Sequence, residues 1–392
     1  MRLPSLLAAV ERGDDPVVFD FLDHTTPEAL GRDDAVALLT AAAYAGRHEV
    51  VDRLVVRDSD VTRPRAGGPD LVTWAARHGR YRVLQALLSS RHDPLAPDSP
   101  HRRALRVAQD ALRTGSGAGT EPPPAHRAIV TELEAALGVH RSPDELLARA
   151  LVHADPDHDD WFSSLYQLGL RADQETFDWA RELATDRSSL ARRRFGLDTV
   201  QFLGLAPSIS VDDIELSFDS EAVELLRPML QDEQDPYALG TVIAAFTSYS
   251  SLDESHVVLR HSGHPDPRVR RTVASCLTLA RADGAAVDRA VLGALRRLAA
   301  DPDPDVRETA LHQLTWSSAD TPELRAVLAS QLAHPRLEAR IAAAGGLALR
   351  GDPCGRSVLE EIGADPEHRR TLGQGGLGDL RHLLTSAPAP PT

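Results

Sequence analysis

The segments AAAYAGRHEVVDRLV (residues 41–55) and WAARHGRYRVLQALL (residues 74–88) repeat one pattern at a distance of 33 residues. Each segment holds small residues, then a glycine, then apolar residues in adjacent pairs. The glycine recurs once more towards the N-terminus, so that Gly13, Gly46 and Gly79 follow the same period. A period near 33 residues that is held at several positions predicts an array of small helical units, each packed on its neighbours.

Each unit of this array is expected to form two short helices and a turn. In the second unit we expect helices over residues 37–45 and 49–56. Gly46 stands at the end of the first helix, where a left-handed backbone costs glycine little. Apolar residues at positions 50, 51, 54 and 55 share one face of the second helix, which we therefore expect to be buried.

These segments resemble the helical half of the ankyrin repeat. Asp60 and Asp93 match the aspartate of that family's hairpin, whereas its Thr-Pro-Leu-His opening is replaced by DLVT at residues 70–73. We expect less regular hairpins for that reason. A further unit pairs RRALRVAQDAL with HRAIVTELEAAL around a Gly- and Pro-rich insertion at residues 114–125. The resemblance implies about four ankyrin-like units over residues 1–138.

A second rhythm begins past residue 140. Its clearest copies are HPDPRVRRTVASCLTLA (residues 264–280) and DPDPDVRETALHQLTW (residues 301–316). Asp-Pro is a helix-start signal, because Asp caps the helix and Pro fits its first turn. The copies strongly resemble HEAT repeats, whose units are paired antiparallel helices. The resemblance implies about seven units over residues 141–385, with an irregular loop at residues 206–220 and a disordered Pro-rich tail at residues 386–392.

The predicted fold class is therefore an all-α solenoid, with ankyrin-like helical repeats stacked on HEAT-like helical hairpins. The HEAT resemblance also implies a structural role for a recurring arginine, because in that family such residues form a ladder of turn hydrogen bonds and ion pairs. The units that carry it have Arg193, Arg270, Arg307, Arg340 and Arg369. Two further units have Trp161 and Leu239 at this position.

The negative charge is concentrated in one part of the chain. The formal net charge is −15, and residues 141–260 hold 23 acidic against 10 basic residues, a difference of −13. Such a segment repels nucleic-acid phosphates and favours a basic partner. All 43 basic residues are arginine, which excludes chemistry that depends on lysine, such as a P-loop or a Schiff base.

We expect a cytoplasmic, bacterial protein. The use of arginine alone is typical of a GC-rich genome. Cys276 and Cys354 show no ligand-like spacing, which fits a reducing compartment. The N-terminal residues become acidic before an apolar stretch of signal-peptide length, so no export signal is expected. No apolar run approaches the roughly 18 residues that a membrane span needs.

Two segments that contain histidine could hold a metal ion, but both favour a structural role. HADPDHDD at residues 153–160 offers two imidazoles and several carboxylates, which suit a divalent ion. It falls, however, at a turn where other units have Asp-Pro-Asp-Pro, so capping explains it. His264 also precedes a repeat turn, and His256 and His261 lie on one short helix. The sequence lacks recognised catalytic and nucleotide-binding motifs, and we expect no catalytic residue, metal or cofactor.

A binding surface is the better prediction. In ankyrin-like stacks the two positions before each repeating glycine face the concave side, which makes Tyr44, Arg77 and His78 contact candidates. Aromatic and arginine side chains are favoured interface anchors. In the HEAT-like array, the acidic residues between positions 141 and 260 would make the concave groove negative. The acidic candidates are Asp159, Asp160, Asp212, Asp213 and Glu215.

The leading hypothesis is a non-catalytic scaffold or adaptor that binds a protein partner, basic if it docks in the acidic groove, through the concave surface. The alternative is a HEAT-like enzyme or enzyme accessory, similar to the DNA glycosylases or chromophore lyases of that architecture. A glycosylase would need a basic groove, which the charge of residues 141–260 opposes. A third hypothesis, which the sequence neither supports nor excludes, is a regulator whose solenoid changes curvature when it binds a small ligand. The partner, the oligomeric state and the orientation of the two arrays are not predicted.

Overall fold

The computed structural model describes residues 3–23, 25–26, 30–62, 70–88, 94–95, 99–115, 125–209, 218–250, 252–277, 289–317 and 319–365. These residues are mostly helical and contain no strand, so the protein is an all-α solenoid, as predicted. The chain divides into two compact units, Met1–Arg171 (unit 1) and Ala172–Thr392 (unit 2). None of the described helices combines the length and the apolar character that a bilayer crossing requires.

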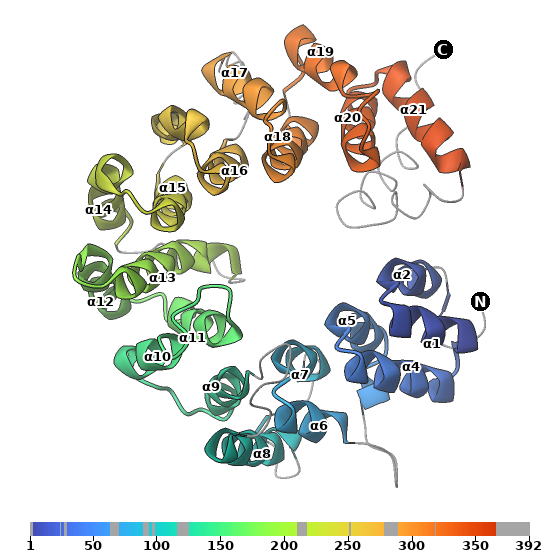
Figure 1. The fold of residues 1–392 in the computed structure, drawn as a ribbon, viewed down its shortest axis with the longest axis vertical. Coiled ribbons are helices and arrows are strands. Elements are labelled where there is room, and N and C mark those ends of the chain that lie inside the picture. The colour runs from blue at the N-terminus through green and yellow to red at the C-terminus, as the bar shows by residue number, and fades with distance from the viewer. Residues whose placement is uncertain are drawn as a thin grey trace. The chain divides into compact units, whose positions relative to one another are not determined.

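The helices of unit 1 up to Ala136 lie in two rows, and two further helices follow them (Figure 1). In order they are α1 (Leu3–Arg12), α2 (Asp15–Asp23), α4 (Arg32–Tyr44), α5 (His48–Arg57), α6 (Leu71–Arg77), α7 (Tyr81–Leu88), α8 (Pro100–Thr114), α9 (His126–Ala136), α10 (Pro143–Ala150) and α11 (Asp159–Gly169), with a 3-10 turn at Ser59–Thr62. One row holds α1, α4, α6 and α8, and the other holds α2, α5, α7 and α9. A continuous cluster of buried apolar side chains lies between the rows.

The repeating glycines of unit 1 have the backbone that the sequence predicted. Gly13, Gly46 and Gly79 have φ of 75°, 73° and 64°, in the left-handed region. The helix predicted over residues 37–45 is longer than expected and begins at Arg32, because two acidic residues in its first turn favour that end. The two segments assigned to the predicted fourth unit form α8 and α9, which pack on each other, and residues 116–124 of the insertion lie outside the described residues.

Unit 2 consists of helical hairpins. Its helices are α12 (Gln174–Thr185), α13 (Leu190–Ile209), α14 (Asp219–Asp232), α15 (Pro236–Tyr249), the 3-10 helix η2 (Leu252–Gly263), α16 (Pro267–Cys276), α17 (Arg289–Leu298), α18 (Pro304–Trp316), α19 (Pro322–Ser330), α20 (Leu337–Leu349) and α21 (Pro353–Ala364). A continuous row is formed by α13, α15, α16, α18 and α20 (Figure 1). The other helices up to α19 pack against members of this row, and α21 packs on α20.

The Asp-Pro signals of unit 2 start helices as predicted. Asp235, Asp266, Asp303 and Asp352 each cap a helix with a side-chain oxygen, and a proline follows each of them in the first turn. The loop predicted at residues 206–220 is shorter than expected, since α13 continues to Ile209 and α14 begins at Asp219. Residues 210–217 lie outside the described part of the chain.

The boundary between the two contact units does not coincide with the predicted change of repeat type. We predicted that change between residues 138 and 141, whereas the contacts divide the chain at Arg171. The cause is that α11 packs on both α9 and α10, which joins the helix pair α10–α11 to the N-terminal array. The predicted limits of the two repeat arrays stay a prediction.

The recurring arginine of unit 2 has the predicted structural role at Arg193, Arg270 and Arg307. Arg270 donates two parallel hydrogen bonds, of 2.7 and 2.8 Å, to the carboxylate of Asp301, and this holds the pKa of Asp301 below its usual value. Arg307 donates to the carbonyl oxygens of Asp301 and Pro302. Arg193 pairs in the same way with Glu233.

The ladder is not continuous beyond these residues. The Nε of Arg340 has no hydrogen-bond partner in the described part of the chain, and Arg369 lies outside it. Where arginine is replaced by Trp161 or Leu239, the side chain is buried instead, with 1% and 3% of its surface exposed.

Two glycines inside helices of unit 2 provide a matched stability test. A Cβ on Gly196 of α13 would lie 2.5 Å from the backbone nitrogen of Ala184 in α12, whereas a Cβ on Gly293 of α17 would have no neighbour nearer than 3.8 Å. Gly196→Ala is expected to lower the free energy of unfolding by about 1–3 kcal/mol through overpacking. Gly293→Ala is expected to raise it by about 0.5–1 kcal/mol through helix propensity. Urea denaturation of both variants checks this, and changes of the same sign would contradict it.

Candidate protein-interaction surface

Three aromatic side chains form a row, here called the ring row, on the first helices of two adjacent units of unit 1. The rings of Tyr44 and Trp74 have centroids 4.7 Å apart with planes inclined at 54°. Trp74 and His78 are stacked, with centroids 4.8 Å apart and planes at 30°. Half of the surface of Tyr44 is exposed, and His78 is also exposed. The ring row joins α4 to α6 by contacts that are open to solvent.

The local structure explains why these rings meet. Gly46 and Gly79 end the first helices, so Tyr44 and His78 lie at corresponding C-terminal ends. Trp74 lies four residues before His78 and therefore on the same face of α6. The Nδ1 of His78 is 2.8 Å from the carbonyl oxygen of Trp74, which orients the imidazole.

The structure thus brings together two of the predicted contact residues, Tyr44 and His78, and places the third, Arg77, exposed next to His78. Trp74 is absent from the predicted contact residues. Its four-residue spacing from His78 was the signal that could have identified it, because residues at that spacing share a helix face.

The predicted acidic contacts in unit 1 have different surroundings. Asp160 is 1% exposed, and its Oδ1 accepts a hydrogen bond of 2.8 Å from the backbone of Ala128. Its Oδ2 accepts from Arg127 at 3.0 Å and lies 3.2 Å from the Nδ1 of His153. Asp160 therefore ties α11 to α9 and has no exposed carboxylate for a partner. Asp159 pairs with the exposed Arg82 at 3.3 Å and is itself partly exposed, so it stays a candidate.

His158 has a role that recurs along the chain. Its Nδ1 accepts a hydrogen bond of 3.1 Å from the backbone nitrogen of Asp160, two residues later. Equivalent bonds, between 2.8 and 3.1 Å, are accepted by the side chains of Glu233, His264, Asp301 and His334. Because carboxylates and imidazoles replace one another here, His158 and His264 act as turn acceptors. His256 and His261 were predicted to share one short helix. They share the 3-10 helix η2.

His153, His158 and Asp160 come close enough to suggest a metal site, since one ligand atom from each lies within 4.8 Å of the others. The two imidazoles are stacked with centroids only 3.7 Å apart and planes at 20°. A metal ion binds an imidazole nitrogen in the plane of the ring, and two stacked rings share no such point. The Nδ1 of His158 already accepts a hydrogen bond, and Arg127 already occupies the carboxylate. The cluster favours a structural role.

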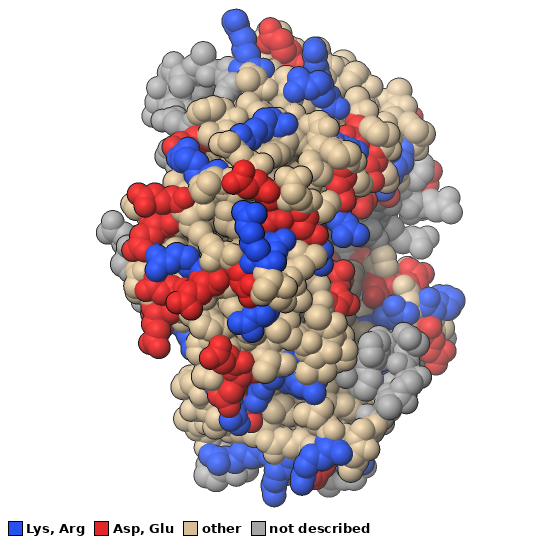
Figure 2. Space-filling model, turned by 60° about the vertical axis from the view of Figure 1, so that its left-hand side comes forward, with Lys and Arg blue, Asp and Glu red and all other residues tan. Residues whose placement is uncertain are grey.

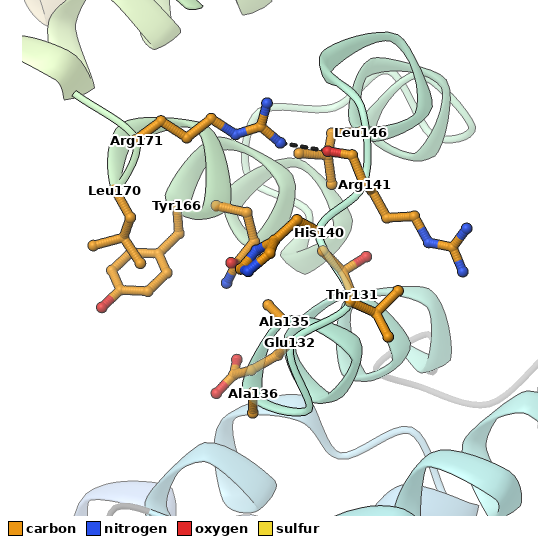
Figure 3. Close-up of a pocket in the computed structure, with 12 residues that line it drawn as sticks. Thr131, Glu132, Ala135, Ala136, His140, Arg141, Leu146, Tyr166, Leu170 and Arg171 are labelled. Carbon is orange, nitrogen blue, oxygen red and sulfur yellow. Dashed lines mark hydrogen bonds between the residues drawn. The ribbon is translucent and has the colours of Figure 1, made fainter. Parts of the chain in front are cut away.

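Unit 1 also contains a pocket of about 560 Å³ between α9, the turn that follows it and α11 (Figure 3). Tyr166 of α11 and Leu170, which follows that helix, lie side by side on one wall, and Glu132 and Ala136 of α9 form the opposite wall. His140 of the connecting turn projects between the two walls. No sequence pattern marks this pocket, because its walls come from segments separated in the chain.

Glu132 is hydrogen-bonded from behind the pocket. Gln85 of α7 donates from its Nε2 to Glu132 at 2.9 Å and to the hydroxyl of Tyr81 at 2.8 Å. Burial raises the pKa of Glu132, and hydrogen bonds from Tyr81 and Gln85 oppose that rise. Burial and the neighbouring carboxylate of Glu132 also raise the pKa of Tyr81, so its phenol stays protonated and donates. Glu132 is a desolvated carboxyl group at the wall of an open pocket.

Many acidic residues of unit 2 are paired with arginine. Arg181 contacts Glu221, and Arg227 contacts Glu254, both at 2.7–2.8 Å. Arg194 holds the carboxylate of Asp235 with two hydrogen bonds of 2.6 and 2.9 Å. Figure 2 shows acidic and basic side chains interspersed over much of the face that it draws. The pairing reduces the expected acidic field of residues 141–260. The candidates Asp212, Asp213 and Glu215 lie outside the described residues.

Comparison with known proteins supports the second repeat type. Residues 255–348 and 292–374 match the family model of HEAT repeats, which confirms that prediction for this part of the chain. The ankyrin resemblance of the N-terminal region is not confirmed by a family model. Among solved structures, the X-ray structure of YibA from Escherichia coli is similar, with a TM-score of 0.45 and 20% sequence identity over 64% of this chain and 88% of that one. No curated protein sequence matches this chain significantly.

Proposed function

We propose that this protein is a non-catalytic scaffold that binds a protein partner through the ring row of unit 1 and the neighbouring Arg77. The observation that carries the proposal is the row of contacting rings of Tyr44, Trp74 and His78, of which Tyr44 and His78 are exposed. Aromatic and arginine side chains dominate the binding energy of protein interfaces. In the ankyrin-like interpretation, this face is the concave surface of the array.

The HEAT repeats of residues 255–374 support the same proposal, because helical repeats of this kind present extended surfaces on which partners dock. The charge balance supports a protein rather than a nucleic acid as the partner, since a net charge of −15 repels phosphates. The competing hypothesis of a glycosylase-like enzyme requires tight duplex DNA binding. A gel shift with duplex DNA at low salt separates the two, and tight binding there would favour the enzyme.

The test of the proposal is site-specific photo-cross-linking in the native cell extract. With p-benzoylphenylalanine in place of Tyr44, a discrete protein adduct is expected. The same cross-linker in place of Val56, which is 75% exposed on α5 and outside the ring row, is the matched control and is expected to give none. Equal adducts at the two positions, or no adduct at either, would contradict the proposal.

Once the partner is purified, the variants Arg77→Ala and His78→Ala are expected to raise its dissociation constant by about 10- to 30-fold each. Both side chains are exposed, so little loss of stability is expected. Isothermal titration measures the change, with Val56→Ala as the control. An unchanged dissociation constant in both variants would exclude the ring row as the docking site.

A further inference from the structure

The pocket of unit 1 presents a carboxylate that lacks a cation. The hydrogen-bond donors to Glu132 are the neutral side chains of Gln85 and Tyr81. Among the described residues, no arginine lies within ion-pair distance of Glu132. A partly buried carboxylate costs free energy unless a positive charge compensates it. The open space in front of Glu132 is therefore suited to a cation supplied from outside the chain.

The two arginines that line the same pocket, Arg141 and Arg171, donate their hydrogen bonds to groups other than Glu132. Arg141 donates to Glu134 at 2.7 and 3.0 Å and to Glu145 at 3.2 Å. Figure 3 shows its guanidinium pointing away from Tyr166 and Leu170. Arg171 lies on the opposite side of the pocket from Glu132 and donates to the carbonyl oxygen of Arg141. The negative charge of Glu132 would therefore repel an anionic ligand, and neither arginine is placed to offset that repulsion.

The walls of the pocket suit the stem of a long basic side chain. Val139 and Leu170 at its rim are 42% and 52% exposed. Phe162, 41% exposed, stacks on Tyr166 with ring centroids 6.1 Å apart and planes at 25°. Exposed apolar side chains around a hollow mark docking sites. Aromatic faces attract guanidinium and ammonium groups, and the methylenes of arginine and lysine pack on apolar walls.

We propose that this pocket receives an arginine or lysine side chain of a protein partner, with Glu132 as its counter-ion and Tyr166 as an aromatic wall. The proposal rests on the proposed function of protein binding, but it uses a surface of unit 1 other than the ring row. It names the chemistry of the partner as a basic residue flanked by apolar ones. The pocket is then a specificity element, because a cation supplies the charge compensation that the neutral donors Gln85 and Tyr81 do not.

The first test needs no partner. n-Butylguanidinium and its neutral analogue N-butylurea are titrated into the full-length protein, and the methyl resonances of Leu170 and Val139 are followed by NMR. We expect saturable shifts and about tenfold tighter binding of the cation, as a charge-assisted hydrogen bond provides. Glu132→Gln is expected to abolish that difference. The matched control is Glu11→Gln, because Glu11 is an exposed acidic residue of the same unit that does not line the pocket, and it is expected to preserve the difference.

The second test identifies the source of the cation. With p-benzoylphenylalanine in place of Leu170, we expect a discrete protein adduct in the cell extract that Glu132→Gln removes and excess n-butylguanidinium suppresses. Binding of n-butylguanidinium without any adduct would assign the pocket to a small amine and overturn the proposal. Equal binding of both small probes, or no effect of Glu132→Gln, would overturn it as well.

The experiments distinguish a failure of the ring-row proposal from a failure of the pocket proposal. The variant His78→Ala is expected to leave the n-butylguanidinium titration unchanged, because the ring row takes no part in the pocket. If cross-linking at the ring row fails while the adduct at Leu170 forms, the proposed docking face is wrong and the pocket stands. If the reverse is seen, the pocket proposal is wrong and the scaffold function stands.

Discussion

Asp160→Ala is expected to lower the free energy of unfolding of unit 1 by about 3–5 kcal/mol, the usual cost of breaking a buried charge pair. The substitution leaves the guanidinium of Arg127 and the backbone nitrogen of Ala128 without their acceptor. It also removes the link between α11 and α9. Amide hydrogen exchange in the full-length protein is the measurement, and faster exchange is expected in both helices.

Asp159→Ala is the matched control, because Asp159 is the adjacent acidic residue. Its pair with Arg82 is exposed, so a cost below about 1 kcal/mol is expected. Asp160→Asn is expected to fall between the two, because the amide keeps one acceptor oxygen for Ala128 and loses the charge that Arg127 requires. Equal costs for the substitutions at positions 159 and 160 would refute the structural role of Asp160.

Arg350→Met is expected to cost about 3–5 kcal/mol in unit 2, because several buried carbonyl groups lose their donor together. Arg350 follows α20, and its Nε, Nη1 and Nη2 all donate. The five acceptors are the carbonyl oxygens of Leu314, Thr315, Ser317, Ala319 and Gly346, at 2.6–3.1 Å. Several of these lie at the C-terminal end of α18, where unpaired carbonyls carry partial negative charge. Denaturation by urea and hydrogen exchange in α18 measure the loss.

The control for this prediction is Arg356→Met on α21, since Arg356 is exposed. A change within about 0.5 kcal/mol is expected there. Arg350→Lys is expected to be intermediate, because an ammonium keeps the charge but offers three donors instead of five. Burial lowers the pKa of Arg350 from its ordinary value. If Arg350→Met unfolds at the same urea concentration as Arg356→Met, the proposed anchoring of α18 is wrong.

The candidate sites show which inferences from sequence hold in this protein. Tyr44 and His78 were identified because their positions relative to a repeating glycine predict exposure, and both are exposed. Asp160 was predicted as a contact residue from the local excess of acidic residues alone, and it is buried. Charge along the chain does not distinguish a solvated carboxylate from one that accepts bonds from a neighbouring helix. That distinction depends on where Arg127 and Ala128 lie, in a helix more than thirty residues away.

The sequence by itself determined the features that depend on nearby residues. The glycine period and the Asp-Pro caps set where helices begin and end, because capping and left-handed turns are interactions within a few residues. Only the tertiary structure decided which polar groups meet. The pocket combines Glu132 of α9 with Tyr166 of α11, and Glu132 is held by Gln85 of α7. A repeat period in the sequence does not predict these contacts between helices. They depend on how neighbouring helices pack and on which side chains each one places at the contact.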